Sequence, residues 1–171
     1  CGTGMNVPEA ISGQLDVSRE TMDRLAAYVT LVEKWQQRVN LISASTLPDI
    51  WVRHIWDSAQ LVPLVPAGTG RILDVGSGAG FPGLVLAALC DAELHLVESD
   101  QKKAVFLQTV IREIGIHATV HNERIESQPH IGADIVTARA LAPIDRLLEL
   151  LKTQLVPGTR CLFLKGVRAE A

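Results

Sequence analysis

The stretch that decides the fold is ILDVGSGAGFPG, which occupies residues 72–83. Its first four residues are apolar apart from Asp74 and predict a short buried strand, and the glycines that follow predict a tight turn leading into a helix. We expect Pro82 in the first turn of that helix, where its missing amide hydrogen leaves no bond unmade. Small residues between a strand and a helix let a ligand approach the backbone, so the stretch predicts a ligand-binding loop.

Beyond this loop, short runs rich in β-forming residues alternate with runs of helical length. Such alternation is typical of a sheet with helices on both faces, and it predicts a doubly wound α/β fold with a mostly parallel sheet. The expected strands are residues 72–75, 94–98, 119–121, 135–138 and 161–164, and the expected helices are residues 81–89, 101–114 and 144–155.

The sequence before the loop has a helical pattern instead. Ser18 is a suitable N-cap, and apolar residues recur at three- and four-residue steps from Met22 to Val39. A second helix is expected to begin near Thr46, with Pro48 in its first turn, and to run to Leu61.

Turn-forming residues cluster between Pro63 and Gly70, where the helical pattern gives way to the alternating one. We therefore divide the 171-residue chain into an N-terminal helical extension, residues 1–70, and a ligand-binding core, residues 71–171. Cys1 to Gly4 are interpreted as residues ahead of a native start at Met5.

Two ligands fit the glycine loop. Gly78, Gly80 and Gly83 satisfy the GxGxxG pattern that holds a pyrophosphate in NAD-dependent oxidoreductases. Asp74 argues against that ligand, because a carboxylate at the strand end repels a pyrophosphate and attracts a cation. S-adenosylmethionine carries a sulfonium and an ammonium group, and the arrangement DxGxGxG matches the first motif of class I methyltransferases. The loop therefore favours S-adenosylmethionine, with NAD as the alternative.

Acidic residues after the second and third strands are further candidate contacts. Glu98 closes the second strand about 20 residues beyond the loop, where a carboxylate accepts hydrogen bonds from the ribose of either nucleoside. Its alternative role, shared with Asp74, is to cap a neighbouring helix. After the third strand, Ile125 is expected to flank the adenine ring, and Glu126 or neighbouring backbone to meet its amino group.

Arg139 ends the fourth expected strand, at the same edge of the sheet as the loop. We expect its side chain beside the methyl-donor cavity, because ligands of such sheets bind outside the carboxyl ends of the strands. A salt bridge with Asp134 or Asp145 is the alternative role of this arginine.

Composition excludes several classes of function. The formal net charge is -3 and aromatic residues make up only 4% of the chain, so RNA binding would need a local basic patch and little base stacking. One such patch is expected between Arg139 and Arg168. The apolar runs are too short to span a bilayer, and the cysteines and histidines lack the spacing of metal ligands. We expect a cytoplasmic, metal-free monomer.

A short helical stretch brings together His54, Asp57 and Ser58. This trio suggests a hydrolase only weakly, because the nucleophile elbow GxSxG is absent and the trio lies in the helical extension. We expect these residues either to pack against the glycine loop or to contact RNA.

From about Leu31 to Gly166 the chain resembles the bacterial small-subunit ribosomal RNA guanine-N7 methyltransferases, the glucose-inhibited division protein B family. The stretches that carry the resemblance are Glu33-Lys34-Trp35, Asn40-Leu41, Val52-Arg53-His54-Ile55, Asp57-Ser58, residues 74–83, Ala138-Arg139-Ala140 and Leu164-Lys165-Gly166. The resemblance implies an S-adenosylmethionine-dependent enzyme that acts on 16S ribosomal RNA or a ribosomal particle. It implies donor contacts at Gly76, Phe81, Glu98, Ile125, Glu126 and Arg139, and RNA contacts at Lys165 and the basic patch. Gly78, within the glycine pattern, is a further candidate donor contact.

Methyl transfer to guanine N7 is an in-line displacement in which an unprotonated lone pair attacks, so no general base is compulsory. The sequence has no Pro-Pro-aromatic motif after the fourth strand for exocyclic amino groups and no Pro-Cys nucleophile for carbon. No catalytic residue is therefore assigned, and Arg139 and Lys165 are candidates for positioning the guanine.

Two further expectations complete the sequence-based interpretation. In the family, another helix and a terminal β-hairpin follow the fifth strand, so we expect this chain to lack the hairpin and to be truncated. A non-enzymatic RNA-binding or assembly module on the same fold is the alternative function.

Overall fold

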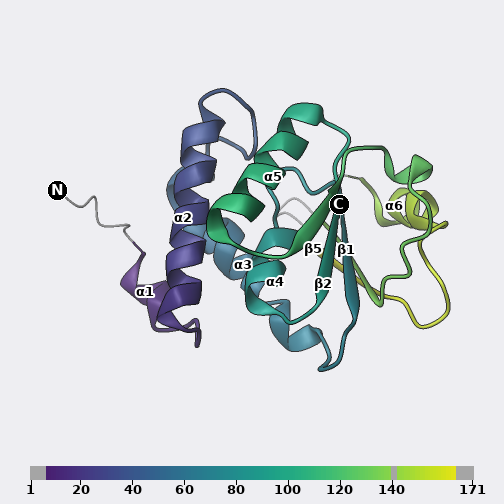
Figure 1. Ribbon diagram of the computed structural model, residues 1–171, viewed down its shortest axis with the longest axis horizontal. Coiled ribbons are helices and arrows are strands. Elements are labelled where there is room, and N and C mark those ends of the chain that lie inside the picture. Colours follow the sequence, from purple (N-terminus) through teal and green to yellow (C-terminus); the bar gives the residue numbers. More distant parts are fainter. Residues whose placement is uncertain (1–6, 140–141, 165–171) are drawn as a thin grey trace.

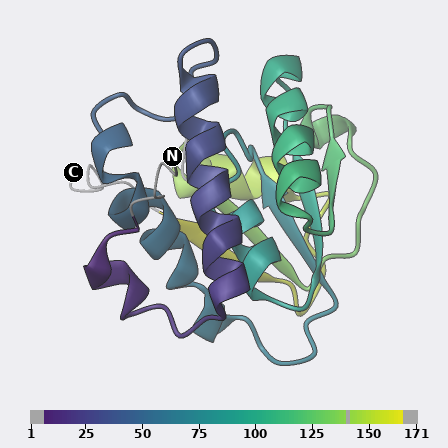
Figure 2. The same ribbon diagram turned by 60° about the vertical axis from the view of Figure 1, so that its left-hand side comes forward.

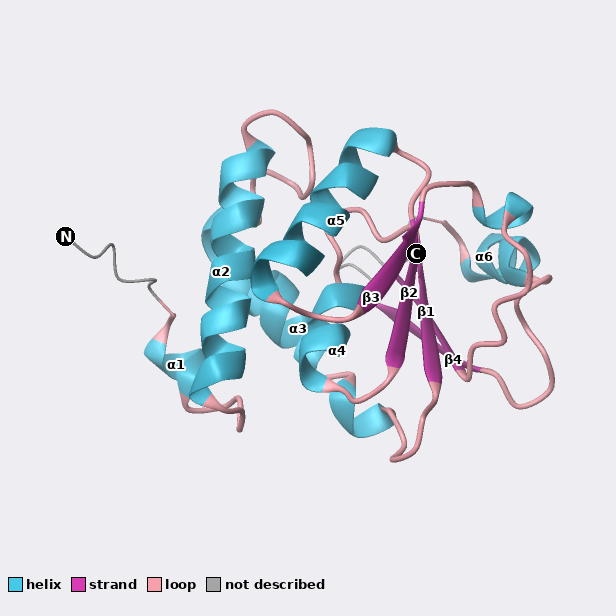
Figure 3. Cartoon of the chain, in the orientation of Figure 1, coloured by secondary structure: helices cyan, strands magenta, loops and turns pink. Residues whose placement is uncertain are grey.

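A five-stranded parallel sheet forms the centre of the computed structural model (Figure 3), which describes residues 7–139 and 142–164. The strand order is β3-β2-β1-β4-β5, and every neighbouring pair is parallel. The bounds are β1 Arg71–Val75, β2 Glu93–Val97, β3 Ala118–His121, β4 Ile135–Arg139 and β5 Arg160–Leu164. The order reverses beside β1, and the resulting crevice at the carboxyl ends of β1 and β4 is where sheets of this kind bind ligands. The predicted doubly wound α/β fold is confirmed.

Helices cover the two faces of the sheet unequally (Figure 1). Helices α4 (Gly83–Leu89) and α5 (Gln101–Ile114) lie on one face, and α6 (Ile144–Leu151) lies on the other. The prediction for α5 is confirmed at both ends, because Asp100 caps its start and Gly115 ends it with φ +66°.

Helix α6 ends four residues earlier than predicted because Gln154 is needed outside it. The buried Gln154 carboxamide accepts a hydrogen bond from the Ile131 amide at 3.0 Å and donates one to the Gln128 carbonyl at 3.0 Å. These bonds tie the loop before β4 to the chain after α6, so the backbone leaves the helix at Lys152.

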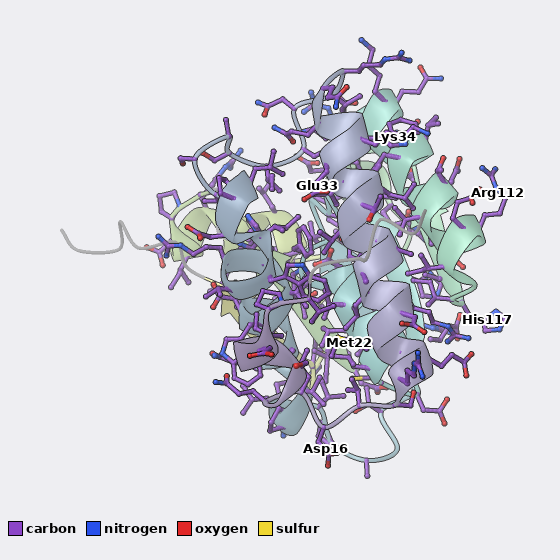
Figure 4. All side chains as sticks on the ribbon, turned by 90° about the vertical axis from the view of Figure 1, so that its left-hand side faces the viewer. Asp16, Met22, Glu33, Lys34, Arg112 and His117 are labelled. Atoms are coloured by element: carbon purple, nitrogen blue, oxygen red, sulfur yellow. The ribbon has the colours of Figure 1, made fainter. Side chains whose placement is uncertain are left out.

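The N-terminal region contains α1 (Glu9–Ser12) and the long helix α2 (Arg19–Gln36). The predicted N-cap is confirmed, since the Ser18 hydroxyl accepts a hydrogen bond from the Thr21 amide at 3.1 Å. Helix α2 turns its apolar residues toward α5, whereas Glu33 and Lys34 on α2 and Arg112 on α5 face outward (Figure 4). The sequence analysis missed α1, which at four residues is too short to show a helical period.

The second predicted helix is not a continuous α-helix. The chain forms a 3₁₀ turn at Leu47–Asp49, a π-helical segment at Trp51–Trp56, a short α-helix α3 at Asp57–Ala59 and a 3₁₀ turn at Val62–Leu64. Periodicity did not reveal this, because π and α turns differ by only one residue in their hydrogen bonding.

Residues from both sides of position 70 share one hydrophobic core. Buried α2 residues such as Leu25 and Val32 belong to the same cluster as Phe106 of α5, and Trp35 packs edge-on against Phe106 with ring centroids 5.5 Å apart. Figure 2 shows α2 and α5 side by side. The division at residue 70 remains our proposal for the organisation of the chain, and this packing fixes the extension against the core.

Candidate methyl-donor site

The glycine loop after β1 adopts a backbone that only glycine adopts readily. Gly76, Gly78 and Gly80 have φ of +66°, +54° and +91°. At Gly80 a side chain is also excluded by space, since a Cβ would stand 2.7 Å from the Tyr28 hydroxyl. The amide of Gly76 donates to the Val97 carbonyl at 2.9 Å, which fixes the loop across the end of β2.

Glu98 directly follows β2 and links the loop to the start of α5. Its Oε2 accepts a hydrogen bond from the Gly78 amide at 2.7 Å, and its Oε1 accepts one from the Asp100 amide at 2.8 Å. Each carboxylate oxygen keeps a second lone pair, so the same group can accept bonds from two hydroxyls of a ligand. Asp100 is the N-cap of α5, and Glu98 accepts the amide of that N-cap residue, so Glu98 also supports the start of the helix.

A cavity of about 380 Å³ opens at this edge of the sheet. The loop, the residues that follow β2, the end of β4 and the start of α5 line it on the side of the core, and the extension contributes the remaining residues. The lining residues are Leu41, Ile42, Ser43, His54, Gly76, Ser77, Gly78, Ala79, Phe81, Glu98, Ser99, Lys103 and Arg139. Five of the predicted donor residues, Gly76, Gly78, Phe81, Glu98 and Arg139, therefore share one cavity.

Ile125 and Glu126 line a smaller adjoining hollow of about 160 Å³. Gly76 and Ser99 border both spaces, so the two are neighbours. Ile125 is buried and Glu126 is exposed, as suits an apolar contact with a ring and a polar contact at its rim. An elongated ligand can therefore extend from the glycine loop to Ile125.

Arg139 ends β4 and holds its guanidinium over the Phe81 ring, 5.9 Å from the ring centroid. Burial lowers the pKa of this side chain. Its Nε and Nη2 atoms are buried and have no hydrogen-bond partner among the described residues. The salt-bridge alternative is wrong: Asp134 instead accepts the Gly70 and Arg71 amides, and no ion pair in the described chain joins Arg139 to Asp134 or Asp145.

Asp74 does not line the cavity, contrary to the expectation that it faces the ligand. It is 1% exposed and lies behind the loop, where its Oδ1 accepts a hydrogen bond from the Thr137 hydroxyl at 2.8 Å. Burial raises the pKa of this carboxyl to about 6, against the opposing effect of the Thr137 bond. Its charge acts on the site through the loop and not by direct contact.

Two aromatic residues of the extension, Tyr28 and His54, hold the loop, and the sequence analysis assigned no role in the site to Tyr28. The Tyr28 hydroxyl donates to the Ala79 carbonyl, and the Tyr28 ring stacks on Phe81 at 5.1 Å. The His54 ring also stacks on Phe81, with the two ring centroids 4.9 Å apart. For His54 the expected packing against the glycine loop is confirmed, whereas Tyr28 gave no signal beyond its place on an apolar helix face.

The hydrolase interpretation of His54, Asp57 and Ser58 fails on geometry. The Ser58 hydroxyl is buried and donates to the His54 carbonyl at 2.6 Å, not to its imidazole ring. Lys165, the second positioning candidate, lies outside the described residues. Within the described part of the chain, no cluster of three potential metal ligands occurs and no helix is long and apolar enough to cross a membrane.

The fold and the cavity define a class I S-adenosylmethionine-dependent methyltransferase. Solved structures with this fold include an S-adenosyl-L-methionine-dependent methyltransferase described as putative from Methanococcus maripaludis, with a TM-score of 0.58, 14% identity and coverage of 72% of this chain and 62% of that one. A methyltransferase from Geobacter sulfurreducens in complex with S-adenosyl-L-homocysteine has a TM-score of 0.52, 19% identity and coverage of 80% and 54%. At this level of identity the likeness concerns the fold.

The chain belongs to the rRNA small subunit methyltransferase G family, whose model matches residues 21–171. It is 53% identical to the ribosomal RNA small subunit methyltransferase G of Paramagnetospirillum magneticum, over 95% of this chain and 80% of the relative. It is 56% identical to the protein of the same description from Rhodospirillum centenum, over 88% of this chain and 69% of the relative. The family resemblance noted in the sequence is confirmed.

Proposed function

We propose that this protein transfers a methyl group from S-adenosylmethionine to N7 of a guanine in 16S ribosomal RNA. The observation that carries the proposal is the cavity at the carboxyl ends of β1 and β4, which brings Glu98, Arg139 and the glycine loop together. Membership of the methyltransferase G family supports the RNA substrate. An NAD-dependent oxidoreductase is not favoured, since the family and the related folds are those of methyltransferases.

The residues present fit the donor. S-adenosylmethionine supplies an electrophilic methyl group when bound. We assign the ribose to Glu98, whose carboxylate keeps free lone pairs, and the adenine to the hollow beside Ile125 and Glu126. Arg139, with buried N–H groups that lack a partner in the described chain, suits the carboxylate at the other end of the donor.

The protein's contribution to the transfer step is alignment. Guanine N7 attacks through a lone pair, so the chain need not remove a proton. Hydrogen bonds to Tyr28 and Glu98 fix the glycine loop at Ala79 and Gly78, which limits the positions available to the methyl group. Holding the two reacting atoms in line in this way can supply several kcal/mol of the rate enhancement.

We further propose ribosomal RNA, free or within a ribosomal particle, as the partner of a cytoplasmic monomer. Lys103 also lines the cavity, and we assign it to a contact with a phosphate of the RNA. In the described part of the expected basic patch, Arg146 pairs with Glu149 at 3.2 Å and Arg160 donates to the Leu64 carbonyl, whereas Lys165 and Arg168 lie outside the described residues.

The proposal is tested by methylation of small ribosomal subunits isolated from a strain that lacks the enzyme. We expect incorporation of one methyl group per subunit from labelled S-adenosylmethionine, and mass spectrometry of nuclease digests should identify it as 7-methylguanosine. Binding of S-adenosylhomocysteine without transfer to subunits or free RNA would support the non-enzymatic module. Binding of NAD in its place would overturn the assignment.

A further inference from the structure

His54 is the most deeply buried polar side chain contributed by the extension to the cavity wall. Its residue exposure is 7%, and its ring stacks on Phe81 directly beside Arg139. Its Nδ1 atom is buried and has no hydrogen-bond partner among the described residues. A buried polar atom without a partner costs free energy, so its presence at a binding cavity indicates a contact that a ligand completes.

A chain of hydrogen bonds defines which nitrogen of His54 carries the hydrogen. The Thr46 hydroxyl has one hydrogen and donates it to the Ser43 carbonyl, with the two oxygens 2.9 Å apart. The same hydroxyl oxygen lies 2.9 Å from Nε2 of His54. Both bonds form together only if Nε2–H donates to Thr46, which leaves Nδ1 as a bare lone pair.

The imidazole is also held neutral. Burial, together with the nearby positive charges of Arg139 and Arg53, lowers the pKa of His54 to about 4. At neutral pH this side chain is therefore a hydrogen-bond acceptor at Nδ1, and its counterpart on a ligand has to be an N–H or O–H donor.

The position of His54 selects the part of the donor that it meets. Glu98 and Ile125 mark the adenosine end, because the small hollow joins the main cavity at Gly76 and Ser99. His54 and Arg139 lie together beside Phe81, at the part of the cavity left for the amino-acid end. That end carries a carboxylate, which Arg139 matches, and an ammonium group, which requires an acceptor.

We infer that Nδ1 of His54 accepts a hydrogen bond from the α-ammonium group of the methionyl part of the donor. This inference rests on the proposed function only in its choice of ligand, and it makes His54 a donor-binding residue supplied by the extension. A guanine N–H is the competing counterpart. The ammonium is favoured because His54 and the Phe81 ring on which it stacks are both buried residues of the cavity that we assign to the donor.

The inference is tested by calorimetry with three ligands on wild-type protein and His54→Phe, which keeps the stacking on Phe81 and removes the acceptor. S-adenosylhomocysteine has both amino-acid groups, its decarboxylated analogue keeps only the amine, and 5′-methylthioadenosine has neither. We expect His54→Phe to weaken binding of the first two by about 10- to 100-fold, the range for a hydrogen bond to a charged group, and to leave 5′-methylthioadenosine unchanged.

Thr46→Val is the matched control, because it removes the group that fixes the tautomer but leaves His54 in place. We expect it to weaken the two amine-containing ligands less than His54→Phe does. In ¹⁵N spectra, His54 of the wild type should appear as the neutral Nε2–H tautomer, with an Nδ1 resonance that shifts when S-adenosylhomocysteine binds.

Three outcomes overturn the inference: an equal loss for all three ligands, a protonated Nδ1, or unchanged ligand affinity with a raised KM for RNA. The last would assign His54 to the guanine. Thermal unfolding of each variant identifies one that is not folded, in which case the ¹⁵N measurement on wild-type protein decides. Amine-dependent binding without RNA methylation would leave the inference standing and remove the proposed function.

Discussion

The polar side chains at the two ends of the same sheet differ in whether they have hydrogen-bond partners within the protein. Near the amino ends of β1 and β2, the exposed Glu93 bonds to His95 at 2.7 Å and to Arg71 at 3.1 Å, and His95 bonds in turn to His121, which ends β3. At the carboxyl ends, Nδ1 of His54 and two nitrogens of Arg139, both of which line the cavity, are buried without partners in the described chain. The first end satisfies its polar groups internally, and the second keeps them for a ligand.

This difference means that one set of polar groups stabilises the fold and another set is available to bind the donor. A polar group that is buried without a partner lowers the free energy of unfolding, and it persists where a ligand compensates for it. Substitutions of the unpartnered groups at the carboxyl ends should therefore change donor affinity and stability in different directions. Those at the amino ends should change stability alone.

The largest effect is expected from Glu98→Ala. This change removes the acceptor of the Gly78 and Asp100 amides as well as the proposed ribose contact. We expect S-adenosylhomocysteine affinity, measured by calorimetry, to fall about 100-fold or more, because each hydrogen bond to a charged group is worth about 10- to 100-fold in affinity. Glu98→Gln keeps a carbonyl oxygen and should lose less. Unchanged affinity in the alanine variant would remove Glu98 from the donor site.

Arg139→Met should separate affinity from stability most clearly. Methionine fills a similar volume over Phe81 but has no charge to bury, so we expect the melting temperature of the ligand-free protein to rise. Donor affinity should fall about 10- to 100-fold with the loss of the carboxylate contact. Arg139→Lys, which keeps the charge without the planar fork, is the control. A lower melting temperature in Arg139→Met would show that the guanidinium stabilises the protein on its own.

The buried carboxyl of Asp74 predicts a pH dependence. Its pKa in the folded protein is about 6, above the ordinary 3.8, so the protonated form stabilises the fold below pH 3.8 and this contribution is lost as the pH rises through 6. Asp74→Asn is neutral throughout. Its stability relative to wild type should therefore increase between pH 4 and pH 7, by up to about 3 kcal/mol, as followed by urea unfolding. A constant difference across that range would contradict the raised pKa.

Local sequence signals were enough to predict helices and strands whose ends are marked by residues within or next to them. Helix α5 begins after a capping aspartate and ends at a glycine with positive φ, and both signals are visible in the sequence. The same holds for the order of strands, glycine loop and Glu98, because a parallel sheet brings the carboxyl ends of its strands to one edge.

The contacts between the extension and the loop could not be predicted in this way. Tyr28 reaches Ala79 across 51 positions of sequence, and no local period encodes which face of α2 meets the loop. The direction of Asp74 was missed for a related reason: Thr137 on the neighbouring strand accommodates it behind the loop, and only the sheet register brings the two together. Contacts between side chains that are distant in the sequence depend on how the helices and strands pack together. Local sequence patterns do not specify which of these side chains meet.

The smallest effect is expected at the other end of the sheet, from Glu93→Gln. Hydrogen bonds from His95 and Arg71 lower the pKa of this carboxyl, so its contribution to stability is present above its ordinary pKa and lost as the pH falls below it. Because Glu93 is exposed, solvent and salt weaken the pair, and the melting temperature at pH 7 should fall only slightly, with the difference shrinking at high salt. Donor affinity should not change. A loss of S-adenosylhomocysteine binding in this variant would mean that the internally bonded end of the sheet is coupled to the cavity, and that the two ends do not divide stability and function between them.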